Sequence, residues 1–301
     1  GRNMLINGDM SVAQREVTSY AVGDADAYKN VDRWKVFAAN TAGRATMQQS
    51  TDAPSGFTNS LKFSCTTADT SIASNESFGI AQHIEAGTCA RTGTGTSGAK
   101  QITFSFYAKA DSTKTYVVQL LNNKHSSYIH NNRTFTVTSS WQRFTMTFQA
   151  DTTADSEFDG TLTDAGFSLS FYLHAGSDFT SATLASDWAT GTTNRAAGTQ
   201  SFFSATSNTF FVTGCQLEVG DTATDFEHRS FDDELARCQR YYIKYGAGGG
   251  GGAAFCSNAS DTYRRAHITH PVEQRAAGTL TVTWSAGSGA GSLTPPYMAY
   301  G

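Results

Sequence analysis

The sequence of 301 residues is poor in charge, and it has no long apolar run. Asp, Glu, Lys and Arg make up 16% of it, against about 25% in average soluble domains, so Ser, Thr, Asn and Gly must form much of the surface. The formal net charge is −4, and no Lys/Arg cluster is interleaved with aromatic residues, which argues against a nucleic-acid-binding protein. No apolar stretch approaches the roughly 20 residues that span a bilayer, so we expect no membrane insertion.

Cysteine is scarce and unpaired. The five residues Cys65, Cys89, Cys215, Cys238 and Cys256 are odd in number and include no CxxC pair. A disulfide framework needs an even set, and a zinc site of the common type needs close pairs. We therefore expect free, mostly buried thiols, in keeping with folding in a reducing cytosol.

Catalytic signatures are also missing. The seven histidines are scattered without an HExxH pattern, and there is no GxSxG elbow, phosphate-binding loop or dinucleotide fingerprint. His267 and His270 do not form a metal pair, because an i, i+3 spacing on a strand points them to opposite faces. We expect no catalytic residues and no enzymatic activity.

Strand patterns, in contrast, are dense. Apolar residues alternate with polar ones in 102–109, 144–148 and 167–173, and shorter runs at 61–65, 78–84, 116–121 and 134–137 add further strands. Eight or more strands between residues 45 and 220 predict an all-β fold, an antiparallel jelly-roll sandwich over residues 46–228. Residues 1–45 are predicted to form an N-terminal strand and arm, with Trp34 buried in the core.

The segment 210–242 changes from a strand into a helix. Phe211, Thr213, Cys215 and Leu217 lie on one face of the strand, and Ser230 stands at the expected N-cap position. At helical spacing, 231, 235, 238 and 242 share one apolar face. Residues 229–301 are therefore predicted to form a small C-terminal helix-plus-strands subdomain, with strands over 240–245 and from 253, a glycine-rich tip at 246–252 and a last strand over 280–284.

This segment resembles the "QLE.G…T.FE.RS…ELA.CQRYY" region of bacteriophage tail-fibre and related virion proteins. The N-terminal residues 3–10, 13–15 and 32–34 are similar to the "N.LINGDM..AQR…DRW" opening of the same proteins, and residues 271–279 are close to a "PV.MRA.PT" strand. Gln274 and Gly278 replace the usual Met and Pro there. The resemblance implies a tail-fibre or receptor-binding virion protein that folds in the host cytoplasm.

The C-terminal subdomain has too few strands to close its own core, since two-stranded ribbons are only marginally stable. Its apolar residues would then need cover from other chains. That cover would resemble the threefold packing of identical chains about one axis in fibre proteins. We expect a homotrimer with contacts from residues 229–284, chiefly Phe231, Leu235, Tyr241, Tyr242, Tyr245 and Phe255.

Aromatic residues in polar loops are candidates for binding glycans, because sugar C–H faces stack on flat rings while polar side chains bind the hydroxyls. The candidates are Asp187, Trp188, Arg195, Tyr263 and Arg264. For each of them the alternative is a ring or side chain that covers the sandwich edge or a subunit contact.

One acidic loop repeats the first half of a calcium-binding loop. Asp155, Glu157 and Asp159 alternate before Gly160, as oxygen ligands do around Ca²⁺. Gly166 stands where the bidentate Glu is needed, so an ordinary solvated loop is the alternative. A structural Ca²⁺ is the one cofactor that the sequence suggests.

We expect a structural, non-enzymatic virion protein, a tail-fibre or receptor-binding subunit that attaches to host surface glycans and contacts other virion proteins. Two alternatives stay open: a capsid decoration or fibre-stalk protein, and a carbohydrate-binding module of a glycan-degrading enzyme. Glycan binding would favour the receptor-binding subunit or the module, and a position on the particle would favour a virion protein.

Overall fold

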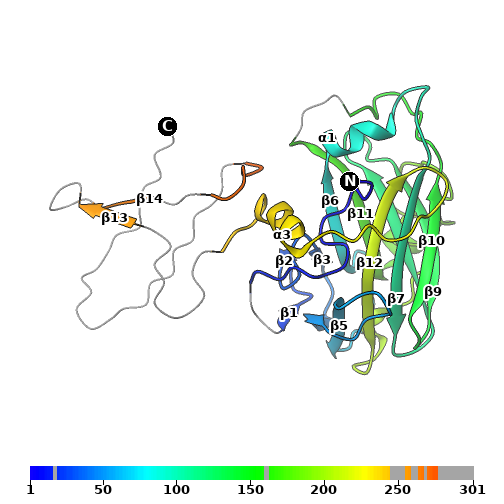
Figure 1. The fold of residues 1–301 in the computed structure, drawn as a ribbon. Helices are drawn as coiled ribbons and strands as arrows, with labels where there is room; N and C mark the ends of the chain where they lie inside the picture. The colour runs from blue at the N-terminus through cyan, green and yellow to red at the C-terminus, as the bar shows by residue number, and fades with distance from the viewer. Residues whose placement is uncertain (16–18, 159–162, 245–254, 259–263, 268–269, 277–301) are drawn as a thin grey trace.

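The computed structural model describes residues 1–15, 19–158, 163–244, 255–258, 264–267 and 270–276, with only the backbone for 255–258 and 264–267. Two antiparallel six-stranded sheets pack face to face (Figure 1). The first contains, in spatial order, β1 (Tyr20–Val22), β4 (Arg44–Ser50), β5 (Ser60–Thr67), β12 (Thr209–Val219), β7 (Ile102–Ala110) and β10 (Gln142–Phe148). The second contains β2 (Ala27–Tyr28), β3 (Lys35–Ala39), β6 (Ser77–Glu85), β11 (Ala165–Ala175), β8 (Lys114–Asn122) and β9 (His130–Val137). Because β3 to β12 pass repeatedly between the sheets, the predicted jelly-roll sandwich is confirmed.

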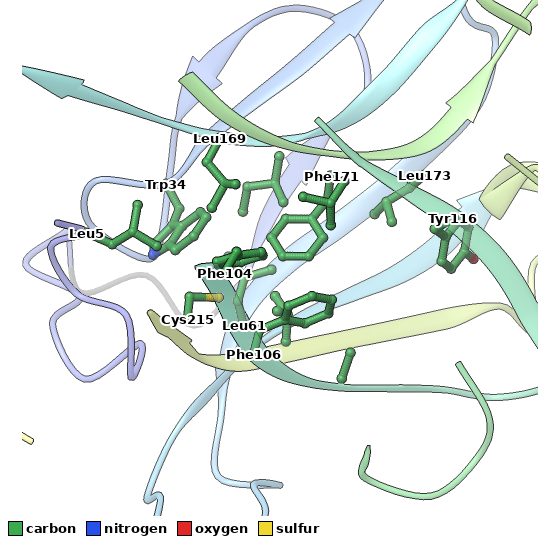
Figure 2. Close-up of a cluster of buried hydrophobic side chains, with 14 of the residues drawn as sticks. Leu5, Trp34, Leu61, Phe104, Phe106, Tyr116, Leu169, Phe171, Leu173 and Cys215 are labelled. Carbon is green, nitrogen blue, oxygen red and sulfur yellow. The ribbon is translucent and has the colours of Figure 1, made fainter. Parts of the chain in front are cut away.

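The core fills the space between the two sheets. Phe104 and Phe106 of β7 point toward Phe171 of β11, and the ring centroids of Phe106 and Phe171 are 5.0 Å apart (Figure 2). Trp34 is fully buried beside them, and its Nε1 donates a hydrogen bond to the carbonyl of Asn7 at 2.9 Å. The prediction of a buried Trp34 is confirmed.

Strand β12 has an irregular register at its centre. Its pairing with β7 shifts between Thr213 and Gln216, and Gly214 adopts φ +62°. A Cβ at this position would lie 2.7 Å from the Phe57 ring and 2.9 Å from the Tyr107 ring, so only glycine fits without displacing them. The bulge places Cys215 in the core while Gln216 and Glu218 face the segment that follows the strand.

Helices are few in the described residues. The short helices are α1 (Ala86–Cys89), α2 (Ser177–Thr180) and two 3₁₀ turns, η1 (Ala90–Thr92) and η2 (Phe202–Ser204); the longer α3 covers Phe231–Gln239. Ser230 Oγ accepts a hydrogen bond from the amide of Asp233 at 3.2 Å, which confirms the predicted N-cap.

The predicted apolar face of α3 is confirmed at Cys238 and is wrong at Phe231. Glu234 and Cys238 are its buried residues, whereas Phe231 is 55% exposed. Glu234 is buried because it accepts hydrogen bonds from the amide of Asn7 and from Arg229, so its charge is paired. Cys238 then packs beside it.

The chain after α3 differs from the predicted strand over 240–245. Residues 240–244 form a turn and irregular structure, with the amides of Tyr241 and Tyr242 bonded to the carbonyl of Cys238. Strand β13 (Phe255–Asn258) pairs with β14 (Arg264–His267), which confirms a strand after residue 253. Residues 271–276 are bends and irregular structure in place of the predicted strand. The glycine run 246–252 and the predicted strand 280–284 lie outside the described residues.

The N-terminal 45 residues supply β1, β2 and β3 to the sheets, but residues 1–10 contain no strand. They are held by bonds such as the Met4 amide to the Leu217 carbonyl, 2.8 Å. Cys65, Cys89, Cys215 and Cys238 are free and buried, as predicted; the Cys256 side chain is not described. In the described parts of the chain, no helix has the length and apolarity to cross a membrane.

Candidate binding cleft

The N-terminal and C-terminal motifs meet in space, although they are more than 200 residues apart. The Glu227 carboxylate accepts hydrogen bonds from the amides of Arg2 (2.9 Å) and Asn3 (2.8 Å). Arg229 donates to the carbonyl of Asn3 at 2.8 Å, and Asn3 Oδ1 accepts from the amide of Leu217 at 3.0 Å. The N-terminal stretch is therefore held between β12 and the segment before α3.

A cavity of 410 Å³ lies where these motifs join the second sheet. Its walls come from the N-terminal loops, from β2, from the end of β6 and from the turn after α3. Side chains that define it are Arg15, Tyr28, Arg33, His83, Glu85 and Tyr241. Apolar groups, including Ile84, Ala165 and the tyrosine rings, line the cavity together with these charged side chains.

Arg33 is the central cation of this cavity. Its guanidinium lies 3.4 Å from the centroid of the Tyr241 ring, and its NH2 donates to the carbonyl of His83 at 2.6 Å. Arg33 is only 6% exposed, and its Nε has no hydrogen-bond partner among the described residues. A buried donor without an acceptor costs about 1–3 kcal/mol. Because this Nε is itself buried, a ligand oxygen reaches it only after the Arg33 side chain moves.

A second guanidinium lies over the neighbouring tyrosine. Arg15 stacks 3.7 Å from the centroid of the Tyr242 ring and forms an ion pair with Asp32 at 2.7 Å. Gln14 Nε2 donates to the same carboxylate at 2.6 Å. Burial raises the pKa of Asp32, and the bonds from Gln14 and Arg15 offset only part of this effect.

Glu85, at the end of β6, ties the turn after α3 to the sheet. It accepts hydrogen bonds from Arg240 Nε at 3.1 Å and from the Tyr241 hydroxyl at 2.6 Å. Burial, together with the bond to Glu85, raises the pKa of Tyr241 to about 12, so this hydroxyl stays a neutral donor.

His83 completes the wall as a neutral group. Burial lowers its pKa, and the positive charges of Lys35 and Arg33 lower it further. Its Nδ1 is 2.6 Å from Ser168 Oγ, which also accepts from Asn123 Nδ2.

The cleft is suited to binding a polar, hydroxyl-rich molecule. Tyr28 offers a ring that is 39% exposed, and the carboxylates of Asp32 and Glu85 already accept bonds from protein groups. Carboxylates held in this way orient the side chains that donate to them.

The predicted glycan residues lie elsewhere. The Trp188 ring is half-buried, stacks on Phe167 at 5.9 Å and donates from Nε1 to the Gln149 carbonyl at 2.8 Å. Arg195 donates to Gln119 Oε1 at 2.7 Å, and Asp187 is exposed. They belong to the loop beside β9, and none of them lines the cleft.

Tyr263 and the side chain of Arg264 lie outside the described residues. In the acidic loop, Asp155 and Glu157 are exposed, and Asp159 is not described. The loop is organised by buried Asp151, whose Oδ1 accepts from the Thr153 amide at 3.0 Å. The calcium site stays a prediction.

The predicted assembly residues divide into two groups. Tyr241 and Tyr242 are covered by arginines of their own chain, and Leu235 is half-buried, whereas Phe231 is exposed. Tyr245 and the side chain of Phe255 lie outside the described residues.

No family model and no curated protein matches the chain. Among solved structures, it is similar to a CBM4 module (16% identity, 71% of this chain and 97% of that one, TM-score 0.36). It is also similar to the enzymatically active domain of bacteriophage CBA120 tailspike protein 4 (11% identity, 72% of this chain and 21% of that one, TM-score 0.40). A third is the family 11 carbohydrate-binding module of Clostridium thermocellum, in complex with a β-1,3-1,4-mixed-linked tetrasaccharide (15% identity, 70% and 99%, TM-score 0.34). Likenesses this distant carry no argument about function, and the fold assignment rests on the sheet topology.

Proposed function

We propose that this protein is a non-enzymatic virion protein that binds host-surface glycan, as a tail-fibre or receptor-binding subunit, through the cleft between α3 and the second sheet. The observation that carries the proposal is the cleft itself, in which the stacked pairs Arg33–Tyr241 and Arg15–Tyr242 lie in one wall with the exposed ring of Tyr28. The resemblance of both terminal motifs to tail-fibre proteins supports the virion assignment, since those motifs build the cleft.

The cleft would bind a sugar by stacking and by hydrogen bonds together. Tyr28 supplies an apolar ring face, and the guanidinium groups of Arg15 and Arg33 supply N–H donors. Contacts of this kind are individually weak. In a homotrimer, three copies of the cleft would gain avidity from their high effective concentration.

The test is a glycan array followed by calorimetry on the best glycan. We expect Tyr28→Ala to weaken binding about tenfold, which is about 1.4 kcal/mol. Tyr128→Ala is the matched control, because Tyr128 is 59% exposed and does not line the cleft. Equal loss in both variants, or no glycan bound by the native protein, would contradict the proposal.

A structural role as a capsid decoration or fibre-stalk protein is the second candidate. The 55% exposure of Phe231 on α3 favours it, because a large exposed apolar side chain suits a protein contact. Density for the chain on a particle, together with an empty glycan array, would support this role instead.

A further inference from the structure

Three ligand-type side chains come together at one end of the sandwich, away from the binding cleft. Asp69 follows β5 in the first sheet, Glu76 precedes β6 in the second, and His174 lies near the end of β11. Their oxygen and nitrogen atoms lie within 4.8 Å of one another. The residues are 5%, 3% and 0% exposed, respectively.

The two carboxyl groups have no Lys or Arg within ion-pair distance among the described residues, and the partner of Glu76 is His174 Nε2 at 2.8 Å. Buried charges are normally paired or bound to metal, because their desolvation is costly.

Asp69 is oriented by three hydrogen bonds. Its Oδ2 accepts from the Thr41 hydroxyl at 2.9 Å and from the Ala42 amide at 2.8 Å, and its Oδ1 accepts from the Ser71 amide at 3.3 Å. These bonds fix the direction of the carboxylate.

Each of the other two groups is also oriented by a neighbour. Glu76 Oε1 accepts from the amide of Ala73 at 2.8 Å, and His174 Nδ1 lies 2.8 Å from Ser201 Oγ. Metal ligands in proteins are typically held in this way by a second contact that fixes their orientation.

We propose that Asp69, Glu76 and His174 bind a divalent transition-metal ion of the zinc type. One imidazole with two carboxylates is a ligand set of Zn²⁺, whereas Ca²⁺ takes oxygen ligands. Tetrahedral ligands at about 2.1 Å from the ion stand roughly 3.4 Å apart. To reach this spacing, the 2.8 Å distance between His174 Nε2 and Glu76 Oε2 would lengthen slightly. Ligand atoms that are up to 4.8 Å apart would move closer together.

In the metal-bound site, His174 would offer the Nε2 lone pair to the ion and would carry its proton on Nδ1, donated to Ser201 Oγ, while any proton displaced from Nε2 would pass to solvent. The ion would join the loop after β5 to β6 and β11, so it would tie the two sheets together. Because the ligands are buried, we assign the site a structural role.

The experiment uses the full chain, stripped with EDTA and then titrated with Zn²⁺, Mn²⁺ or Ca²⁺. We expect about one equivalent of Zn²⁺ by equilibrium dialysis, and a rise in melting temperature of about 5 °C at a hundredfold excess over Kd. Ca²⁺ should have little effect.

Variants of similar shape identify the ligands. His174→Gln, Glu76→Gln and Asp69→Asn should each weaken Zn²⁺ binding at least tenfold. Any one of these variants that folds is sufficient to test the site. His130→Gln is the control, because His130 is also fully buried and hydrogen-bonded. No stoichiometric Zn²⁺ on the native chain, or unchanged binding in a folded ligand variant, would overturn the metal site and leave a proton-sharing cluster.

Discussion

Replacing Trp34 by alanine tests the packing that supports the cleft. The ring is fully buried, lies 6.4 Å from the Phe171 ring and donates from Nε1 to the carbonyl of Asn7. Truncating a buried Trp costs about 3–5 kcal/mol, and the Asn7 carbonyl left without its donor adds about 1 kcal/mol. Because domains are stable by only about 5–15 kcal/mol, a large part of the stability is lost.

The Trp34→Ala substitution would also disturb the binding cleft. Asn7 Nδ2 donates to the carbonyl of Asp32 at 2.8 Å, and Asp32 pairs with Arg15 in the wall. We therefore expect Trp34→Ala to lower both the free energy of unfolding and the glycan affinity. Trp34→Phe, which keeps a ring, should cost less.

Urea denaturation of the native chain, Trp34→Ala and Trp141→Ala measures the effect. Trp141 is only half-buried and donates to Asp52 at 3.0 Å, so its removal should cost about 1 kcal/mol. A Trp34→Ala protein that is soluble, equally stable and deficient only in binding would refute the reasoning, and would make Trp34 a ligand-binding residue.

Three further predictions follow from single features. Burial raises the pKa of Glu227, but bonds from Arg2, Asn3 and Arg229 lower it to about 2. The stabilising effect of the ionised carboxylate is therefore complete above pH 4.5 and is lost as pH falls toward 2. Glu227→Gln should flatten that part of the stability curve measured by urea denaturation. Light scattering should show a trimer at micromolar concentration that Phe231→Ser weakens, whereas a stable 32.2 kDa monomer would count against assembly. If the acidic loop binds Ca²⁺, adding Ca²⁺ to the stripped chain should raise the melting temperature and Asp155→Ala should abolish that rise, and identical melting curves for the two proteins would remove the site.

Much of the sandwich is predictable because the alternating pattern of a strand is visible in a short stretch of sequence. In β7, Phe104 and Phe106 alternate with Thr103 and Ser105, and this period of two is set by the strand itself. The Ser230 cap is local as well, since it needs only the next three residues. Such features depend on short stretches of sequence.

The cleft and the metal cluster could not be predicted in this way. Arg33 meets Tyr241 across more than 200 residues, and His174 is 98 residues from Glu76. Only the tertiary fold brings these groups together. The burial of Glu234 on α3 is unpredictable for a related reason, because its partner Asn7 lies far away in the sequence.

Calorimetric titration of the best glycan into native protein, Arg33→Met and Arg143→Met tests the central claim most directly. Methionine keeps an unbranched apolar side chain beside Tyr241 but removes the guanidinium, and Arg143 is an exposed arginine on β10 outside the cleft. We expect Arg33→Met to weaken binding at least tenfold, about 1.4 kcal/mol, and Arg143→Met to bind as the native protein does. The same Kd for all three proteins would contradict this expectation.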